Sequence, residues 1–213
     1  MDHCRSTTTR FARVTGMAGD GAAPLIAAYR ACEPDASPFE LLTVIQADQM
    51  MRRGSVTLAE NKLAGGGAPV YMYLVEWKSP AMYGFVLAAH GLCVPLSMDN
   101  THTTPAVDTP EGKQLAEAMS EAWLAFAKCG DPNSLATPRW PPYELEHRST
   151  MVFDVESHVV DDPYGVELRA WSSWSRADRS SPWARSRPHG GAELVAAAAL
   201  PDFFALSFEG ENA

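Results

Sequence analysis

His90 is the residue of this sequence best suited to acid–base chemistry. It lies in the segment LAAHGLCVP, residues 87–95, shortly after an apolar run over residues 70–77. An imidazole titrates near neutral pH and can therefore take up and return a proton under physiological conditions. In α/β folds, loops that follow sheet strands carry much of the chemistry. The position predicts a proton-transfer role for His90, while a structural role, common for a histidine in a loop, remains the alternative.

A metal site at the same place is the other chemistry to weigh. His90 and Cys93 are spaced i,i+3, and His102 follows nearby. Structural zinc takes four nitrogen or sulfur ligands, and no second pair is spaced to complete such a set. We therefore expect no metal, and no residue pattern implies a cofactor.

The elements that must position His90 begin with a long helix. Ser37, Pro38 and Glu40 form a capping box with proline at the first helical position. An apolar stripe at helical spacing follows, which predicts a helix pair divided near Gly54 and ended by the glycines at 65–67. The stripe consists of Leu41, Leu42, Ile45, Met51, Val56, Leu58 and Leu63. We interpret Asp48 as a residue of the polar helix face.

A strand over residues 70–77 follows this helix pair. Both alternate sets of its side chains are mostly apolar, so both faces must be covered, as in the interior of an α/β sheet. Thr109 and Gly130 frame a second amphipathic helix over 110–128, in which Trp123 and Phe126 are interpreted as core residues. Two short strands at 150–154 and 158–160 and a short helix over 162–171 complete the predicted elements, with Asp161 and Asp162 in a solvated turn.

Composition limits the possible functions. The chain has 213 residues, a formal net charge of -9 and no apolar run of membrane-spanning length. Its acidic balance argues against nucleic acid or an anionic membrane as a partner. The four cysteines are widely spaced and no secretory signal is evident, so we expect reduced thiols and a cytoplasmic location.

Three segments follow from the same composition. Residues 1–28 are predicted to be a poorly ordered lead segment, and residues 29–171 carry the strong structural signals. Residues 172–213 are predicted to be a tail, rich in Ser, Arg and Pro at first. It ends in an apolar patch that could form a short helix, which Pro201 interrupts or ends.

Seven motifs within residues 29–171 stand in an order that resembles a known family. The chain resembles the C-terminal part of a type B carboxylesterase, close to the para-nitrobenzyl-esterase group. The motifs are YRACEPDASPFELLTVIQADQMMR, AENKLAGGGAPVYMYLVEWKSPA, LAAHGLCVP, LAEAMSEAWLAFAKCGDPN, WPPYE, TMVFD and VVDDPYGVELRAW. The resemblance implies an α/β fold, the C-terminal part of an α/β-hydrolase with an incomplete sheet, flanking helices and a short C-terminal hairpin.

The resemblance also implies roles for particular residues. The family uses a serine–histidine–acid triad, and His90 matches its histidine, the general base and acid. This chain departs from the family pattern at Cys93, where the family has glutamate, which affects how His90 is positioned. No G-x-S-x-G nucleophile motif occurs in the sequence. The nearest imitation, at Ser55, lies on a predicted helix, and His189-Gly190-Gly191 is interpreted as a coincidental match to an oxyanion-hole motif.

These observations predict a serine-esterase segment that acts on a small carboxylic ester only when the missing N-terminal part is supplied, and that is inactive alone. Pairing with an upstream fragment or self-association is then expected. The alternatives are a non-catalytic interaction or structural protein that keeps the hydrolase scaffold, and a hydrolase remnant with a frameshifted tail.

Overall fold

The computed structural model describes residues 22–178 and 203–207. Its backbone forms two compact units. The first contains residues 22–48 and 164–178, and the second contains residues 49–163 and 203–207. The boundaries predicted from composition, 1–28, 29–171 and 172–213, stay a prediction.

The first unit is helical. It contains α2 (Ala22–Cys32), α3 (Pro38–Ala47) and α7 (Gly165–Asp178), and α2 packs against both of the others. Its core consists of Leu25, Tyr29, Leu41, Ile45 and Trp171. The predicted capping box is confirmed, because the Ser37 side chain accepts from the Glu40 amide at 3.2 Å and the Glu40 carboxylate accepts from the Ser37 amide at 2.8 Å.

Two boundaries in this unit differ from the sequence prediction. Helix α2 begins at Ala22, within the segment expected to be poorly ordered. Helix α7 continues to Asp178, beyond the expected end at residue 171. Serine and arginine are acceptable in a helix, and no proline occurs between Gly165 and Pro182, so nothing in the local sequence stops α7 earlier.

The second unit surrounds a four-stranded mixed sheet of order β3-β2-β1-β4. Strand β1 (Val70–Val75) pairs in parallel with β2 (Thr150–Phe153) and antiparallel with β4 (Phe203–Ser207), while β3 (His158–Val160) forms the predicted hairpin with β2. Residues 203–207, after Pro201, form a strand and not a continuation of the helix predicted in this patch, because they pair with β1. Residues 192–202 and 208 of the patch lie outside the described part of the chain.

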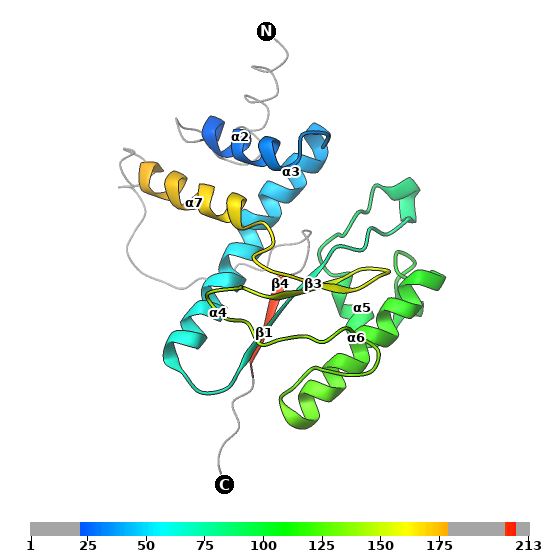
Figure 1. The fold of residues 1–213 in the computed structure, drawn as a ribbon. Helices are drawn as coiled ribbons and strands as arrows, with labels where there is room; N and C mark the ends of the chain where they lie inside the picture. Colours follow the sequence, from blue (N-terminus) through cyan, green and yellow to red (C-terminus); the bar gives the residue numbers. More distant parts are fainter. Residues whose placement is uncertain (1–21, 179–202, 208–213) are drawn as a thin grey trace, which may run out of the picture. The chain divides into compact units, whose positions relative to one another are not determined.

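Helices cover both sides of β1 within this unit. Figure 1 shows α4 (Arg53–Gly65) on one side of the sheet and α5 (Cys93–Ser97) and α6 (Pro110–Cys129) on the other. All six residues of β1 are buried, as its two apolar faces predicted. A π-helical turn, Asp48–Arg52, precedes α4, so the long helix is divided before Gly54 rather than at it.

Helix α6 begins and ends as predicted. The Thr109 hydroxyl accepts from the Gly112 amide at 3.0 Å, and Gly130 caps the end in a left-handed conformation. Gly112 has a steric reason for lacking a side chain, since a Cβ there would lie 2.1 Å from the carbonyl oxygen of Val107. Trp123 and Phe126 pack at the margin of the core, which confirms their structural interpretation.

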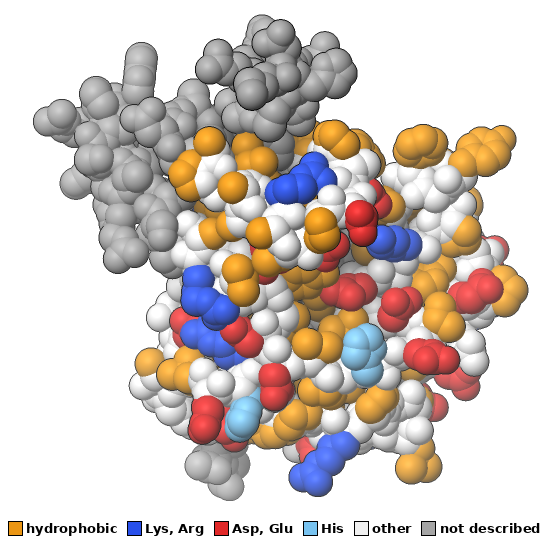
Figure 2. Space-filling view, turned by 45° about the horizontal axis from the view of Figure 1, so that its top comes forward, with side chains coloured by type: hydrophobic (Ala, Val, Ile, Leu, Met, Phe, Trp, Pro, Cys, Tyr) orange, Lys and Arg blue, Asp and Glu red, His pale blue; other side chains and the backbone are white. Residues whose placement is uncertain are grey.

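The visible face of the molecule has a mixed character. Figure 2 shows hydrophobic side chains interspersed with acidic and basic ones on this face. Among the helices that the structure describes, none combines the length and apolarity needed to cross a bilayer.

Candidate functional site

His90 lies in a turn immediately before α5, in the segment that follows β1. The side chain is half-buried, and its Nδ1 atom is buried. Gly91, the next residue, has a φ of 91°, a conformation that glycine adopts without the steric cost of a Cβ. The turn therefore depends on glycine directly after the histidine, and it places one ring nitrogen inward.

Hydrogen bonds of Ser79 fix the start of the segment that leads to His90. The amide of Ser79 donates to the carbonyl of Leu87 at 3.1 Å, and this forms an isolated antiparallel bridge. The hydroxyl of Ser79 donates to the carbonyl of Ala106 at 2.5 Å. Ser79 is a buried polar residue that sequence reasoning missed, since nothing in its neighbours signals a bridge to a residue eight positions away.

The segment after His90 is fixed by the core. Leu92, Cys93 and Leu96 are buried in the main hydrophobic cluster, and α5 packs against α6. The side chain of Cys93 is thus part of an apolar contact surface. Burial at these positions holds the backbone that carries His90.

A cluster of aromatic side chains belongs to the same hydrophobic core as Leu92, Cys93 and Leu96. The Trp140 ring is fully buried, and its indole N–H donates to the Met72 carbonyl of β1 at 3.1 Å. Both the amide and the carbonyl of Trp140 bond the side chain of Asn133, at 2.7 and 2.9 Å. Burial raises the pKa of Tyr71 in this cluster, and the nearby Asp131 carboxylate raises it further, so the phenol stays neutral.

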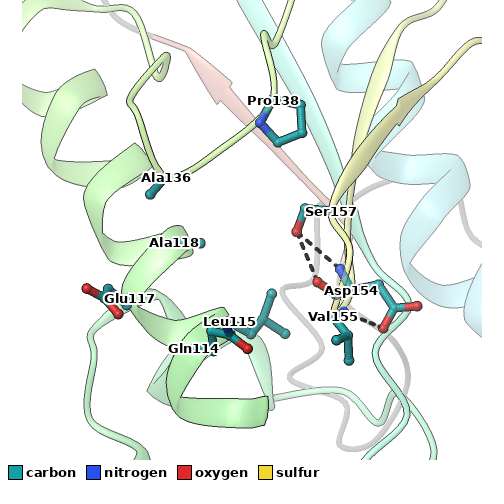
Figure 3. Close-up of a pocket in the computed structure, with 9 residues that line it drawn as sticks. All are labelled: Gln114, Leu115, Glu117, Ala118, Ala136, Pro138, Asp154, Val155 and Ser157. Atoms are coloured by element: carbon teal, nitrogen blue, oxygen red, sulfur yellow. Dashed lines mark hydrogen bonds between the residues drawn. The ribbon is translucent and has the colours of Figure 1, made fainter.

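A cavity of about 300 Å³ lies elsewhere in the second unit. Figure 3 shows side chains from α6, from the loop that follows it and from the β2–β3 turn around this space. The lining residues are Gln114, Leu115, Glu117, Ala118, Ala136, Pro138, Asp154, Val155 and Ser157. His90 does not line the cavity, so the cavity and the predicted proton-transfer residue are separate features.

The structure gives the contacts of the other polar residues that the sequence analysis considered, where they lie in its described part. Ser55 lies within α4, as predicted, and its hydroxyl donates to the Met51 carbonyl at 3.3 Å. In the predicted turn, Asp161 accepts from the Ser149 hydroxyl at 2.7 Å, while Asp162 lies 4.0 Å from the Arg148 guanidinium. His189 lies outside the described residues. Within the described ranges, no group of three or more His, Cys, Asp or Glu side chains could hold a metal ion.

Asp48 requires a correction. Its interpretation as a polar-face residue is wrong, because the residue is fully buried. The Tyr29 hydroxyl donates to its carboxylate, and the Trp171 indole N–H donates to the Tyr29 oxygen at 2.6 Å. A signal was available, because Asp48 continues the i, i+4, i+7 spacing of Leu41 and Ile45 and therefore shares their buried face.

Comparison with known proteins identifies the family. The model of the carboxylesterase family matches residues 35–171. The para-nitrobenzyl esterase of Bacillus subtilis (strain 168) is 36% identical over 100 residues, which are 45% of this chain and 20% of that protein. The phenmedipham hydrolase of Pseudarthrobacter oxydans is 26% identical over 149 residues, 67% of this chain and 29% of its own length.

A solved structure agrees with this match. A carboxylesterase of Geobacillus stearothermophilus superposes with a TM-score of 0.62 at 34% identity, covering 75% of this chain and 33% of that one. The chain thus spans between a fifth and a third of the length of these relatives. The sheet with its flanking helices is a partial α/β-hydrolase fold. The motif order, the fold and the family match lead to one conclusion: the chain belongs to the type B carboxylesterase family.

Proposed function

We propose that this chain is the part of a carboxylic-ester hydrolase that contributes the general-base histidine, His90. The observation that carries the proposal is the place of His90 in the fold of a carboxylesterase family member, in a glycine-dependent turn after β1. In a serine–histidine–acid triad, one ring nitrogen faces the acid and the other faces the serine. The His90 ring is half-buried and its Nδ1 atom is buried, which suits that atom to the position that faces the acid.

The reaction assigns His90 two proton transfers. It removes the proton of a serine hydroxyl as that oxygen attacks the ester carbonyl, and it then gives the proton to the departing alcohol. In the second half of the reaction, a water molecule attacks the acyl-enzyme, and His90 takes the proton of that water and returns it to the serine oxygen. The substrate class is a small carboxylic ester, and the chain's own residues supply the base and its support rather than the nucleophile.

The serine and the acid come from a different segment in this proposal. No G-x-S-x-G occurs in the sequence, and the Ser55 hydroxyl is engaged with its own helix backbone. We expect the chain alone to be inactive, because the loss of a triad nucleophile removes roughly six orders of magnitude of rate. The partner is then an upstream esterase segment that carries the nucleophile elbow.

Hydrolysis of a p-nitrophenyl ester by the purified chain tests this expectation. Wild type, His90→Ala and the control Ser55→Ala should all give the buffer rate. Turnover that disappears in His90→Ala but persists in Ser55→Ala would show that the chain has a nucleophile of its own. Turnover that disappears in Ser55→Ala would identify that residue as the nucleophile.

A second function is favoured by one feature of the surface. Met82, Tyr83 and Phe85 are 73%, 101% and 71% exposed in the segment between β1 and His90, and Met82 and Tyr83 have positive φ. Exposed large apolar side chains of this kind are typical of interaction surfaces. On this alternative the chain is a non-catalytic interaction protein that keeps the hydrolase scaffold and associates with a second copy.

Light scattering over a range of concentrations separates the two functions. A concentration-dependent dimer that Met82→Ser/Tyr83→Ser abolishes, without esterase activity in any mixture, supports the alternative. For either function we propose the cytoplasm as the location. Within the described ranges, Cys32 and Cys129 are exposed thiols outside any disulfide, which supports this proposal.

A further inference from the structure

The sheet of the second unit contains a strand that lies outside the residues matched by the family model. The family match covers residues 35–171, which include β1, β2 and β3 but not β4. Strand β4 nevertheless pairs with β1 over five residues, from Val70↔Ser207 to Leu74↔Phe203. One edge of β1 is therefore covered by a segment from outside the matched carboxylesterase region.

Strand β1 needs a neighbour on that edge. All six of its residues are buried and apolar, as in a strand from the interior of a sheet. Its other edge is taken by β2, in parallel register from Met72↔Thr150 to Val75↔Phe153. Without β4, the N–H and C=O groups along the second edge of β1 would have no strand partner. An unpaired edge beside a wholly apolar surface is a template for pairing with another chain.

We propose that this edge of β1 is an acceptor site for one extended, apolar, antiparallel strand, and that Phe203–Ser207 is its built-in occupant. Main-chain hydrogen bonds supply the affinity in strand addition, and side chains at alternate positions supply the specificity. The sequence of the occupant, FFALS, is apolar and contains no proline or glycine, as this kind of partner requires. The helix α4 packs against both β4 and β1, so the occupant lies under a helix as well as along an edge.

Hydrogen exchange on the intact chain gives the first test. We expect the amides of 203–207 and of 70–74 to be protected together, at least about 10-fold over their unstructured rates. Amides of 203–207 that exchange at unstructured rates would overturn the proposal without any substitution. This measurement does not involve hydrolysis, so its failure is separate from a failure of the proposed function.

Two matched variants give the second test. Successive N–H groups of an antiparallel strand point alternately toward and away from the neighbour. Phe204→Pro/Ala205→Pro therefore removes one N–H that faces β1, whichever residue carries it. Phe204→Ala/Ala205→Ser changes the same positions and keeps both N–H groups. We expect the proline variant to lose the protection of 70–74 while the β2–β3 amides stay protected, and the control to keep both.

A peptide then tests the acceptor site. The acetylated peptide DFFALSF, residues 202–208 of this chain, should bind the proline variant with one peptide per chain, restore the protection of 70–74 and leave wild type unbound. A scrambled peptide should do neither. A proline variant with folded β2–β3 that binds no peptide, or that binds the scrambled one equally well, would overturn the proposal.

Discussion

Trp140→Phe is the substitution whose effect can be worked out most directly from the structure. The Trp140 side chain is fully buried, and its indole N–H donates to the Met72 carbonyl in the central strand. Phenylalanine removes that donor, at a cost of about 1 kcal/mol. It also removes part of a buried ring system, which adds about 1 to 2 kcal/mol from lost burial and the space left behind. The expected loss in the free energy of unfolding is about 2 to 3 kcal/mol.

Urea denaturation followed by far-ultraviolet circular dichroism measures this loss, because that signal does not depend on the removed indole. With a urea dependence of about 2 kcal/mol/M, the midpoint should fall by about 1 to 1.5 M. Trp123→Phe is the matched control. That ring is only half-buried at the edge of the same cluster, so its midpoint should fall by about 0.5 M or less. Equal shifts for the two variants would refute the role given to Trp140.

Three further outcomes are expected. Gly112→Ala should destabilise the chain by about 2 kcal/mol or more, since its Cβ would lie 2.1 Å from a carbonyl oxygen. Gly54→Ala, in open space within α4, should stabilise the chain by about 0.5 to 1 kcal/mol. The midpoints of urea denaturation should therefore shift in opposite directions for the two variants. Tyr29→Phe should lower the free energy of unfolding by about 2 to 4 kcal/mol, because it removes the donor to Asp48 and the acceptor for the indole N–H of Trp171. The rate of amide hydrogen exchange in α2 and α7 should rise. Burial raises the pKa of Tyr71 above its usual 10.0. The free energy of unfolding should therefore fall as the pH rises above about 10, and it should fall less in Tyr71→Phe. Thermal unfolding at several alkaline pH values compares the wild-type chain with this variant.

Local signals were sufficient for most elements of the fold. The capping residues Ser37 and Thr109 act within one helical turn, so their effect can be predicted without tertiary contacts. The doubly apolar run of β1 likewise predicted its burial on both faces. The turn between β2 and β3 follows from alternation and turn residues alone.

The predictions that the structure corrects failed for different physical reasons. Residues 203–207 form a strand because they pair with β1, far away in the sequence, and no local pattern encodes that pairing. The charge of Asp48 favours a solvent-facing position, whereas its helical spacing places it on the buried face with Ile45, and the hydrogen bond from Tyr29 makes that burial possible. The π-helical turn that begins at Asp48 has no sequence signature that periodicity can detect.

The candidate site was predicted only in part. The segment around His90 could be found by resemblance, and the glycine after it by its type. The bridge between Ser79 and Leu87 could not, because it joins two loop segments through backbone atoms. The cavity beside α6 also could not be predicted, since its lining comes from three segments that meet only in the folded chain.

A chimera tests the proposed role of His90 most directly. Residues 35–171 of this chain replace the matching part of the Bacillus subtilis para-nitrobenzyl esterase, so that the relative supplies the remainder of the domain. We predict measurable kcat/KM on a p-nitrophenyl ester that His90→Ala lowers at least about 1,000-fold, with the thermal unfolding midpoint unchanged. A folded, active chimera that keeps its kcat/KM after His90→Ala would contradict the assignment of His90 as the general base.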